Sequence, residues 1–148
     1  MAYLSEWDLR FLRLAKEIST WSKDPSTKVG AVLVDNRKRI VSTGYNGLPQ
    51  GVEDDAKRYL DTDVKLRSLL HAEENAVLFA GGLTQNCTIY VYPFQPCAHC
   101  ASMLIQAGVS RVVSVAKRTN TWSESFSLAR ELFGEAKVPC DIYLGGRV

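Results

Sequence analysis

The sequence predicts an α/β protein, a three-layer α/β/α sandwich built on a mixed five-stranded sheet. Two observations lead to this fold. Segments follow one another in the order helix, hairpin, then alternating helix and strand, and the expected strands are short, apolar and rich in β-branched residues. At 148 residues the chain has the commonest size for one domain, and it contains no internal repeat, low-complexity tract or linker. We therefore expect a single domain over residues 1–148.

The N-terminal segment predicts an amphipathic helix. Ser5-Glu6-Trp7-Asp8 resembles a capping box, whose first and last side chains bond to each other's backbone N–H groups. Pro25 cannot continue a helix, so we expect the helix to end near residues 21–24. The apolar residues at helical spacing are Trp7, Phe11, Leu14, Ala15 and Ile18.

A hairpin and a long loop are expected next. The apolar runs 29–34 and 40–43 flank the polar turn 35–38, which is the pattern of two antiparallel strands. Residues 44–51 are too rich in Gly and Pro for regular structure, and the acidic residues 53–55 keep this segment at the surface. We interpret the segment as a loop with a functional role.

The second half of the chain predicts strands alternating with helices. Gly81 and Gly108 are natural helix stops, and Thr121-Trp122-Ser123-Glu124 resembles a second capping box. The expected strands are 88–92, 111–115 and 140–144, and the expected helices are 66–80, 96–107 with Pro96 in its first turn, and one after the second capping box.

Composition excludes several classes of protein. The chain is 46% hydrophobic and 23% charged with a formal net charge of +2, which favours neither disorder nor a surface for nucleic acid. No apolar run approaches the roughly 18 residues that a membrane span needs, and the N-terminus lacks the apolar core of a signal peptide. We therefore expect a cytoplasmic protein with no membrane or nucleic-acid partner, and with its four cysteines reduced.

Two short motifs carry the residues for metal chemistry, His71-Ala72-Glu73 and Pro96-Cys97-Ala98-His99-Cys100. Cys97 and Cys100 lie three apart at a helix start, so they project from one face, where the helix dipole favours thiolates. With His71 they make three zinc ligands, and a structural zinc site would have four. The vacant position favours one catalytic zinc, which lowers the pKa of a bound water from 15.7 towards roughly 7.

Glu73 is the candidate general acid and base. It follows His71 by two residues and points to a different azimuth, so it can face the water without binding the metal. The backbone N–H of Ala72, at the same helix start, could orient a ring carbonyl.

Other interpretations of these residues stand beside this one. Cys97 and Cys100 would also suit a redox-active or zinc-stabilised binding module in which Glu73 faces solvent. Three roles stay open for His99: a surface residue, a residue that contacts the metal ligands without binding the metal, or a residue that contacts the substrate. We interpret Cys87 and Cys140 as buried strand thiols, and the aromatic residues, Trp122 among them, as core or interface residues.

H-x-E followed by P-C-x-x-C is the signature of zinc-dependent nucleobase deaminases, with the glutamate not a ligand. Over most of its length the chain resembles the deoxycytidylate branch of the cytidine and deoxycytidylate deaminase family. The resemblance is carried by the motifs 24–32, 44–51 with Asp54-Asp55, His71-Ala72-Glu73 with Asn75-Ala76, and Pro96-Cys97 with Cys100-Ala101.

The resemblance implies a cytidine deaminase-like fold and hydrolysis of dCMP to dUMP and ammonia, feeding thymidylate synthesis, in a homo-hexamer. It also implies that Asn46 contacts the sugar, Ala72 the base and Lys28 or a neighbour the phosphate. Many members are activated by dCTP and inhibited by dTTP, with Mg²⁺ accompanying the triphosphate. The positions implied for that effector are Asn46, Gly47, Asp54 and Asp55.

The chain departs from the family pattern at three places. Glu74 replaces a common apolar residue, Phe94-Gln95 precedes Pro96 where a small hydroxyl residue is frequent, and His99 replaces a polar or acidic residue. A deaminase acting on a modified deoxycytidylate or on tRNA adenosine is therefore the alternative substrate class, although the weak net charge argues against tRNA.

Overall fold

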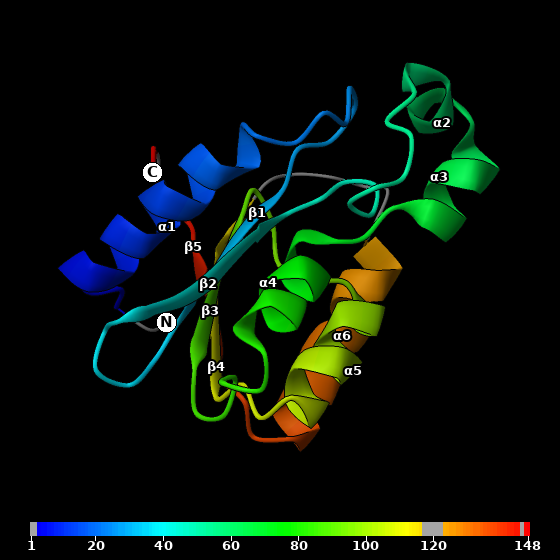
Figure 1. Cartoon of the computed structure of the whole chain (residues 1–148). Coiled ribbons are helices and arrows are strands. Elements are labelled where there is room, and N and C mark those ends of the chain that lie inside the picture. The colour runs from blue at the N-terminus through cyan, green and yellow to red at the C-terminus, as the bar shows by residue number, and fades with distance from the viewer. Residues whose placement is uncertain (1–2, 117–122, 146) are drawn as a thin grey trace.

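The structure is a computed structural model that describes residues 3–116, 123–145 and 147–148. The elements, drawn in Figure 1, are α1 (Glu6–Ser19), β1 (Gly30–Val34), β2 (Ile40–Tyr45), α2 (Ala56–Leu60), α3 (Thr62–Ser68), α4 (Ala72–Ala80), β3 (Thr88–Tyr92), α5 (Ala98–Gln106), β4 (Arg111–Val115), α6 (Ser123–Glu135) and β5 (Cys140–Tyr143).

The described strands form one mixed sheet in the order β2-β1-β3-β4-β5. β1 runs antiparallel to both β2 and β3, whereas β3, β4 and β5 are parallel to one another. The parallel part is connected through helices, as βαβ units require. The predicted mixed five-stranded sheet is confirmed.

Helices cover both faces of the sheet, which gives the predicted three layers (Figure 1). Two buried clusters lie on the two faces of the sheet. Neighbouring residues of β1 belong to different clusters, because successive side chains of a strand point to opposite faces. Val32 packs with Phe11 and Leu12 of α1 in one cluster, and Leu33 packs with Ala76 of α4 and residues of α5 and α6 in the other. The cluster under α4, α5 and α6 supports the site described below. In the part of the chain that the structure describes, no helix has the length and apolar character to span a membrane.

The capping box at the start of α1 is confirmed. The Asp8 N–H donates to Ser5 Oγ at 3.1 Å, and the Ser5 N–H donates to Asp8 Oδ2 at 2.9 Å. The helix ends at Ser19, earlier than predicted, because the N–H groups of Thr20 and Trp21 bond to carbonyls three residues back and tighten the chain into a turn. The second capping box falls partly on residues 121 and 122, outside the described residues.

The prediction of one helix over 66–80 is wrong. α3 ends at Ser68 and α4 begins at Ala72, because the residues between them are extended and Leu70 exchanges two backbone hydrogen bonds with Gly47. Residues 56–65, for which we predicted no element, form α2 and the first part of α3. Asp55 and Asp61 cap these helices by accepting bonds from backbone N–H groups in their first turns.

The loop predicted to begin at residue 44 begins later, because β2 extends through Tyr45. Gly44 is there for packing rather than for a turn. A Cβ on Gly44 would lie 2.3 Å from the carbonyl oxygen of Ala72 and 2.5 Å from the backbone nitrogen of Ala76. The absence of a side chain lets α4 lie directly against β2.

Pro96 lies before α5 rather than in its first turn, since Cys97 is the N-cap residue of that helix. The predicted stops are confirmed: Gly81 and Gly108 both have positive φ, which a side chain would disfavour.

Candidate active site

The candidate site lies where α4 and α5 begin. His71 is the N-cap residue of α4, directly before the helix, and Cys97 is the N-cap residue of α5. A Glu74 carboxylate oxygen accepts the His71 N–H at 3.0 Å, and Ser125 Oγ of α6 accepts the Ala98 N–H at 2.9 Å. α5 follows the parallel strand β3, and α/β proteins characteristically bind ligands at the carboxyl ends of such strands.

His71, Cys97 and Cys100 meet as the sequence predicted. One ligand atom from each lies within 4.8 Å of the other two. His71 Nδ1 is 3.2 Å from Cys100 Sγ and 3.6 Å from Cys97 Sγ. Tetrahedral zinc with ordinary bond lengths would put its nitrogen and sulfur ligands about 3.5 Å apart. The donor set and its spacing therefore fit a zinc ion.

Hydrogen bonds couple the protonation of the three side chains in this group. Hydrogen bonds from Cys100 and His71 lower the pKa of Cys97 to about 4, despite its burial. The hydrogen bond to Cys97 raises the pKa of His71 to about 9. The pKa of Cys100 is raised by its hydrogen bond to Cys97 and by burial. The group thus holds at least one thiolate, the form of cysteine that binds metals.

Glu73 lies beside this group but is not part of it. Its side chain is 4% exposed and lines the same pocket as His71 and Cys97. Burial raises the pKa of Glu73, an effect that the nearby His71 charge opposes. A carboxyl whose pKa is moved towards neutrality is suited to take up and return protons.

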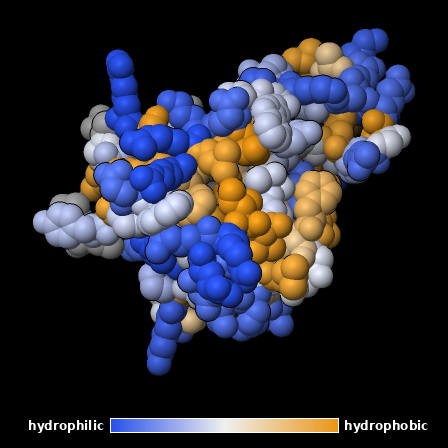
Figure 2. All heavy atoms as spheres, turned by 60° about the vertical axis from the view of Figure 1, so that its left-hand side comes forward, coloured by the Kyte–Doolittle hydropathy of each residue, from blue (hydrophilic) through white to orange (hydrophobic). Residues whose placement is uncertain are grey.

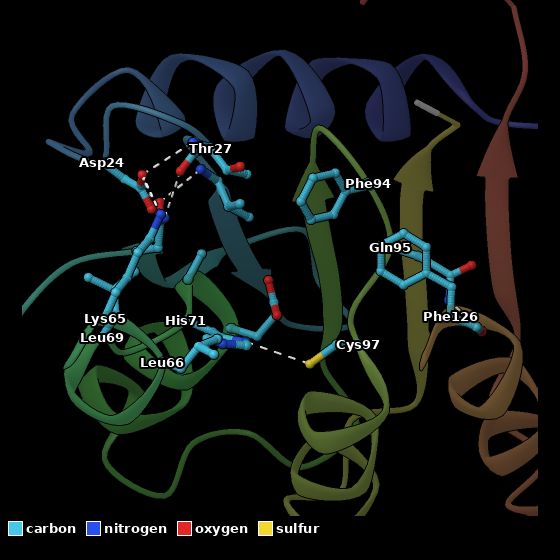
Figure 3. Close-up of a pocket in the computed structure, with 14 residues that line it drawn as sticks. Asp24, Thr27, Lys65, Leu66, Leu69, His71, Phe94, Gln95, Cys97 and Phe126 are labelled. Carbon is cyan, nitrogen blue, oxygen red and sulfur yellow. Dashed lines mark hydrogen bonds and ion pairs between the residues drawn. The ribbon is translucent and has the colours of Figure 1, made fainter. Parts of the chain in front are cut away.

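These residues line a pocket of about 700 Å³, its open mouth included. Figure 3 shows His71 and Cys97 directed toward each other, with Asp24 and Lys65 together on one side and Phe94 on the other. Most of the lining is apolar, with a small number of polar groups, as is usual in small-molecule sites.

The structure brings two of the three predicted substrate contacts to this pocket. Ala72 lies in the first turn of α4 and Asn46 follows β2, and both line the pocket. The Asn46 side chain is 5% exposed; its Oδ1 accepts the Val29 N–H and its Nδ2 donates to the Thr27 carbonyl. Lys28 is exposed, donates to the Ser22 carbonyl and is not among the residues that line the pocket.

Of the positions implied for an effector, only Asn46 lines the pocket. Gly47 pairs with Leu70, Asp54 pairs with Lys23 and accepts the Tyr59 hydroxyl, and Asp55 caps α2. The three residues therefore hold the loop to its neighbours.

Several further residues of the pocket were missed, among them Asp24, Lys65 and Phe126. Asp24 and Lys65 form an ion pair on its wall, and Phe126 of α6 contacts Phe94 with ring centroids 5.5 Å apart. A local signal existed only for Asp24, which opens the first family-like motif. His99 is exposed and lies outside the possible ligand group.

An open group of one imidazole and two thiols, with a buried carboxyl beside it, characterises a zinc-binding hydrolase. The comparisons with known proteins agree. The profile "Cytidine and deoxycytidylate deaminase zinc-binding region" matches residues 5–116. The chain therefore belongs to the cytidine and deoxycytidylate deaminase family, and it is a hydrolase that acts on carbon–nitrogen bonds.

Individual relatives are similar over most of their length. An uncharacterised deaminase of Aliivibrio fischeri is 43% identical over 141 residues, which are 91% of this chain and 92% of the relative. The deoxycytidylate deaminase of Pongo abelii is 38% identical over 141 residues, 90% of this chain and 77% of the relative. The apo crystal structure of dCMP deaminase from cyanophage S-TIM5 has a TM-score of 0.74 at 23% identity, over 95% of this chain and all of that one.

Proposed function

We propose that the chain, acting as one deaminase domain, hydrolyses dCMP to dUMP and ammonia and so supplies dUMP for thymidylate synthesis. The observation that carries the proposal is the group formed by His71, Cys97 and Cys100, together with Glu73, which lines the same pocket as His71 and Cys97. The choice of dCMP among the possible nucleotides and nucleosides rests on the relatives named deoxycytidylate deaminase.

In this proposal His71, Cys97 and Cys100 hold the zinc ion. When bound, zinc supplies the Lewis acidity that makes water a nucleophile at neutral pH. Glu73 takes a proton from the water as its oxygen adds to C4 of the cytosine, and delivers that proton to N3 of the ring. It then carries the second proton to the departing amine, so that the C4–N bond breaks and ammonia leaves.

Backbone and side-chain contacts would orient the nucleotide. The Ala72 N–H, at the start of α4, has no acceptor within the helix and can donate to the carbonyl oxygen of the pyrimidine. We assign the sugar contact to Asn46. Its bonds to the backbone of Val29 and Thr27 support this role, because they hold the amide at the pocket wall.

Regulation by nucleoside triphosphates is part of the proposal. We propose dCTP, with Mg²⁺, as activator and dTTP as inhibitor, bound near Asn46, Gly47, Asp54 and Asp55. The pairing of Gly47 with Leu70 supports a link between this loop and the site, since Leu70 directly precedes His71.

We also propose a cytoplasmic homo-hexamer. The four cysteines are free, as a reducing compartment would keep them. Leu78 and Phe79 of α4 and Leu83 after it are each more than 60% exposed, and Figure 2 shows apolar residues gathered across one face of the molecule. Large exposed apolar patches are typical of surfaces that other chains cover.

One substrate panel tests the activity. Ammonia release would be measured from cytidine, dCMP, dCTP, 5-substituted dCMP, dAMP and dGMP, with and without added dCTP and dTTP. We expect dCMP to have the highest kcat/KM, a stimulated rate with dCTP and a reduced rate with dTTP. Preference for 5-substituted dCMP or a purine nucleotide would contradict the assignment.

The Glu73→Ala variant separates the enzyme from a zinc-stabilised or redox module. We expect it to keep zinc and its fold but to lose ammonia release by at least about 100-fold, because the proton carrier is gone. Near-normal turnover by this variant would rule out the proposed role.

A further inference from the structure

One side of the pocket carries a lysine that the proposed reaction does not use. Lys65 of α3 is the pocket's one lining lysine or arginine among the described residues, and its side chain is 21% exposed. Its Nζ lies 2.9 Å from Asp24 Oδ1 and 2.7 Å from Ser26 Oγ. The chain therefore holds a cation at a defined point on a mostly apolar wall.

Asp24 is a fixed partner for this lysine. Its carboxylate is 1% exposed and accepts the Ser26 N–H at 2.9 Å, the Thr27 N–H at 3.3 Å and Asn46 Nδ2 at 3.3 Å. These bonds come from the segment between α1 and β1 and from the residue after β2, so Asp24 is oriented without help from α3. Lys65 reaches it across 41 positions of sequence.

The ammonium group keeps capacity for a ligand. A lysine side chain has three N–H donors, and the bonds to Asp24 and Ser26 use two of them among the described residues. Because two donors are anchored, the third has a restricted direction. A compact, oriented ammonium is suited to bind a phosphate oxygen.

Lys65 and the reacting end of the pocket are separated. Figure 3 shows Lys65 beside Asp24 at one side, while His71 and Cys97 lie below and toward the opposite side. Leu66 and Leu69 also line the pocket. A base held beside His71 would leave the other end of a nucleotide free to extend past these leucines toward Lys65.

We propose that Lys65 binds the 5′-phosphate of the nucleotide, and that Asp24 and Ser26 position its ammonium group for this contact. The inference rests on the proposed deamination of a nucleoside monophosphate and names the residue that distinguishes the nucleotide from the nucleoside. Lys65 takes the role that the family resemblance implied for Lys28, which is exposed and bonded to the Ser22 carbonyl.

The neighbouring carboxylate makes the phosphate contact conditional. Asp24 repels any anion that approaches Lys65, so a free phosphate gains little from the lysine. A phosphate joined to a base that is already bound is held close, and its effective concentration overcomes this repulsion. Inorganic phosphate is therefore expected to compete weakly with dUMP.

The Lys65→Met variant tests the proposal, because it removes the charge and keeps most of the length of the side chain. Binding of dUMP and of deoxyuridine to the zinc-loaded protein would be measured by calorimetry, and kcat/KM would be measured for dCMP and deoxycytidine. We expect dUMP affinity and dCMP kcat/KM to fall about 10- to 100-fold, the range for one lost charge-assisted hydrogen bond. Values for the two nucleosides should change less than about twofold.

Arg67→Gln is the matched control. Arg67 lies on the same helix, carries the same charge and pairs with Asp63 on the exposed surface. The Arg67→Gln variant should leave the affinities and the kcat/KM values for both nucleotides and nucleosides unchanged. Lys65→Arg should restore part of the nucleotide preference, and Lys65→Gln provides a second neutral variant whose deoxyuridine binding reports on its folding.

Several outcomes would overturn the inference. If Lys65→Met lost affinity and kcat/KM equally for nucleotide and nucleoside, Lys65 would have only a structural role. Unchanged dUMP binding in that variant, or a loss confined to Lys28→Gln, would exclude Lys65 from phosphate binding. If wild type bound dUMP through Lys65 but released no ammonia from dCMP, the deaminase proposal alone would fail.

Discussion

Gly44 of β2 lies directly against Ala72 of α4: a Cβ on the glycine would be 2.3 Å from the alanine's carbonyl oxygen. Both atoms that such a Cβ would strike first belong to the α4 backbone. A helix backbone cannot move aside as a flexible side chain can. The position of α4, and with it that of His71 and Glu73, therefore depends on a glycine in the neighbouring strand.

Gly44→Ala is expected to destabilise the protein and the site together. Overpacking of this kind typically lowers the free energy of unfolding by about 1–3 kcal/mol. We expect weaker zinc retention and a lower kcat, measured by denaturant unfolding, metal analysis and ammonia release. Gly134→Ala is the control, because a Cβ there meets nothing within 4 Å and Ala favours the helix α6. Wild-type zinc affinity in Gly44→Ala would contradict the coupling.

Cys97→Ala is expected to lose zinc and activity together. It removes the thiolate of the group, whose pKa is lowered to about 4 by hydrogen bonds from Cys100 and His71. Cys140→Ala provides a cysteine control on β5, where burial raises the thiol pKa to about 11. Elemental analysis should give one zinc per chain in the control and near none in Cys97→Ala. Full occupancy in the latter would remove Cys97 from the ligand set.

Asp8→Asn is expected to change how stability depends on pH. The Asp8 carboxylate is 4% exposed; burial opposes its ionisation, but hydrogen bonds from Arg111, the Ser5 N–H and Tyr90 lower its pKa to about 2. Because the folded pKa is below the ordinary 3.8, the stabilisation is present above pH 3.8 and is lost as the pH falls towards 2. From the size of the pKa shift we expect ionised Asp8 to contribute about 2 kcal/mol to the free energy of unfolding near neutral pH.

Urea unfolding of wild type and Asp8→Asn between pH 6 and pH 2.5 would measure this effect. The difference in unfolding free energy should be largest near neutral pH and should narrow below pH 3.8. Asp63→Asn, at an exposed pair with Arg67, should follow wild type throughout. A difference between wild type and Asp8→Asn that is constant with pH would contradict the lowered pKa.

The exposed apolar side chains of α4 predict a change in assembly. Leu78 is 64% and Phe79 is 68% exposed. If these side chains are covered in the proposed hexamer, replacing both with Gln should reduce the molar mass measured by sedimentation at micromolar concentration. Leu60→Gln, at an exposed position of α2, is the control and should leave the molar mass unchanged. Retention of full mass by the Leu78/Phe79 variant would place the interface elsewhere.

Local sequence signals predicted those features whose causes are local. The Ser5 and Asp8 capping box and the strands of the sheet follow from residues a few positions apart. The three possible metal ligands lie on two motifs that are each local, although His71 is 26 positions from Cys97. The Asp55 and Asp61 caps of α2 and α3 were equally local signals. Asp55 was interpreted only as part of the acidic surface run 53–55, and no element was predicted around Asp61.

Features with distant causes could not be predicted. The break before α4 depends on Leu70 bonding to Gly47, and the place of Lys65 in the pocket depends on Asp24. Both partners lie more than 20 positions away in sequence, and neither carries a pattern that specifies the other. The extension of β2 through Gly44 likewise reflects how closely α4 approaches it.

The pocket draws its lining from residues as far apart as Asp24 and Phe126. During synthesis, a nascent chain that has not yet formed α6 lacks one wall, and one that has lost its N-terminal part lacks another. Contacts of such long range form late, after the loops between them have closed. Turnover should therefore appear only once folding is nearly complete, which makes activity a sensitive reporter of the native fraction during refolding.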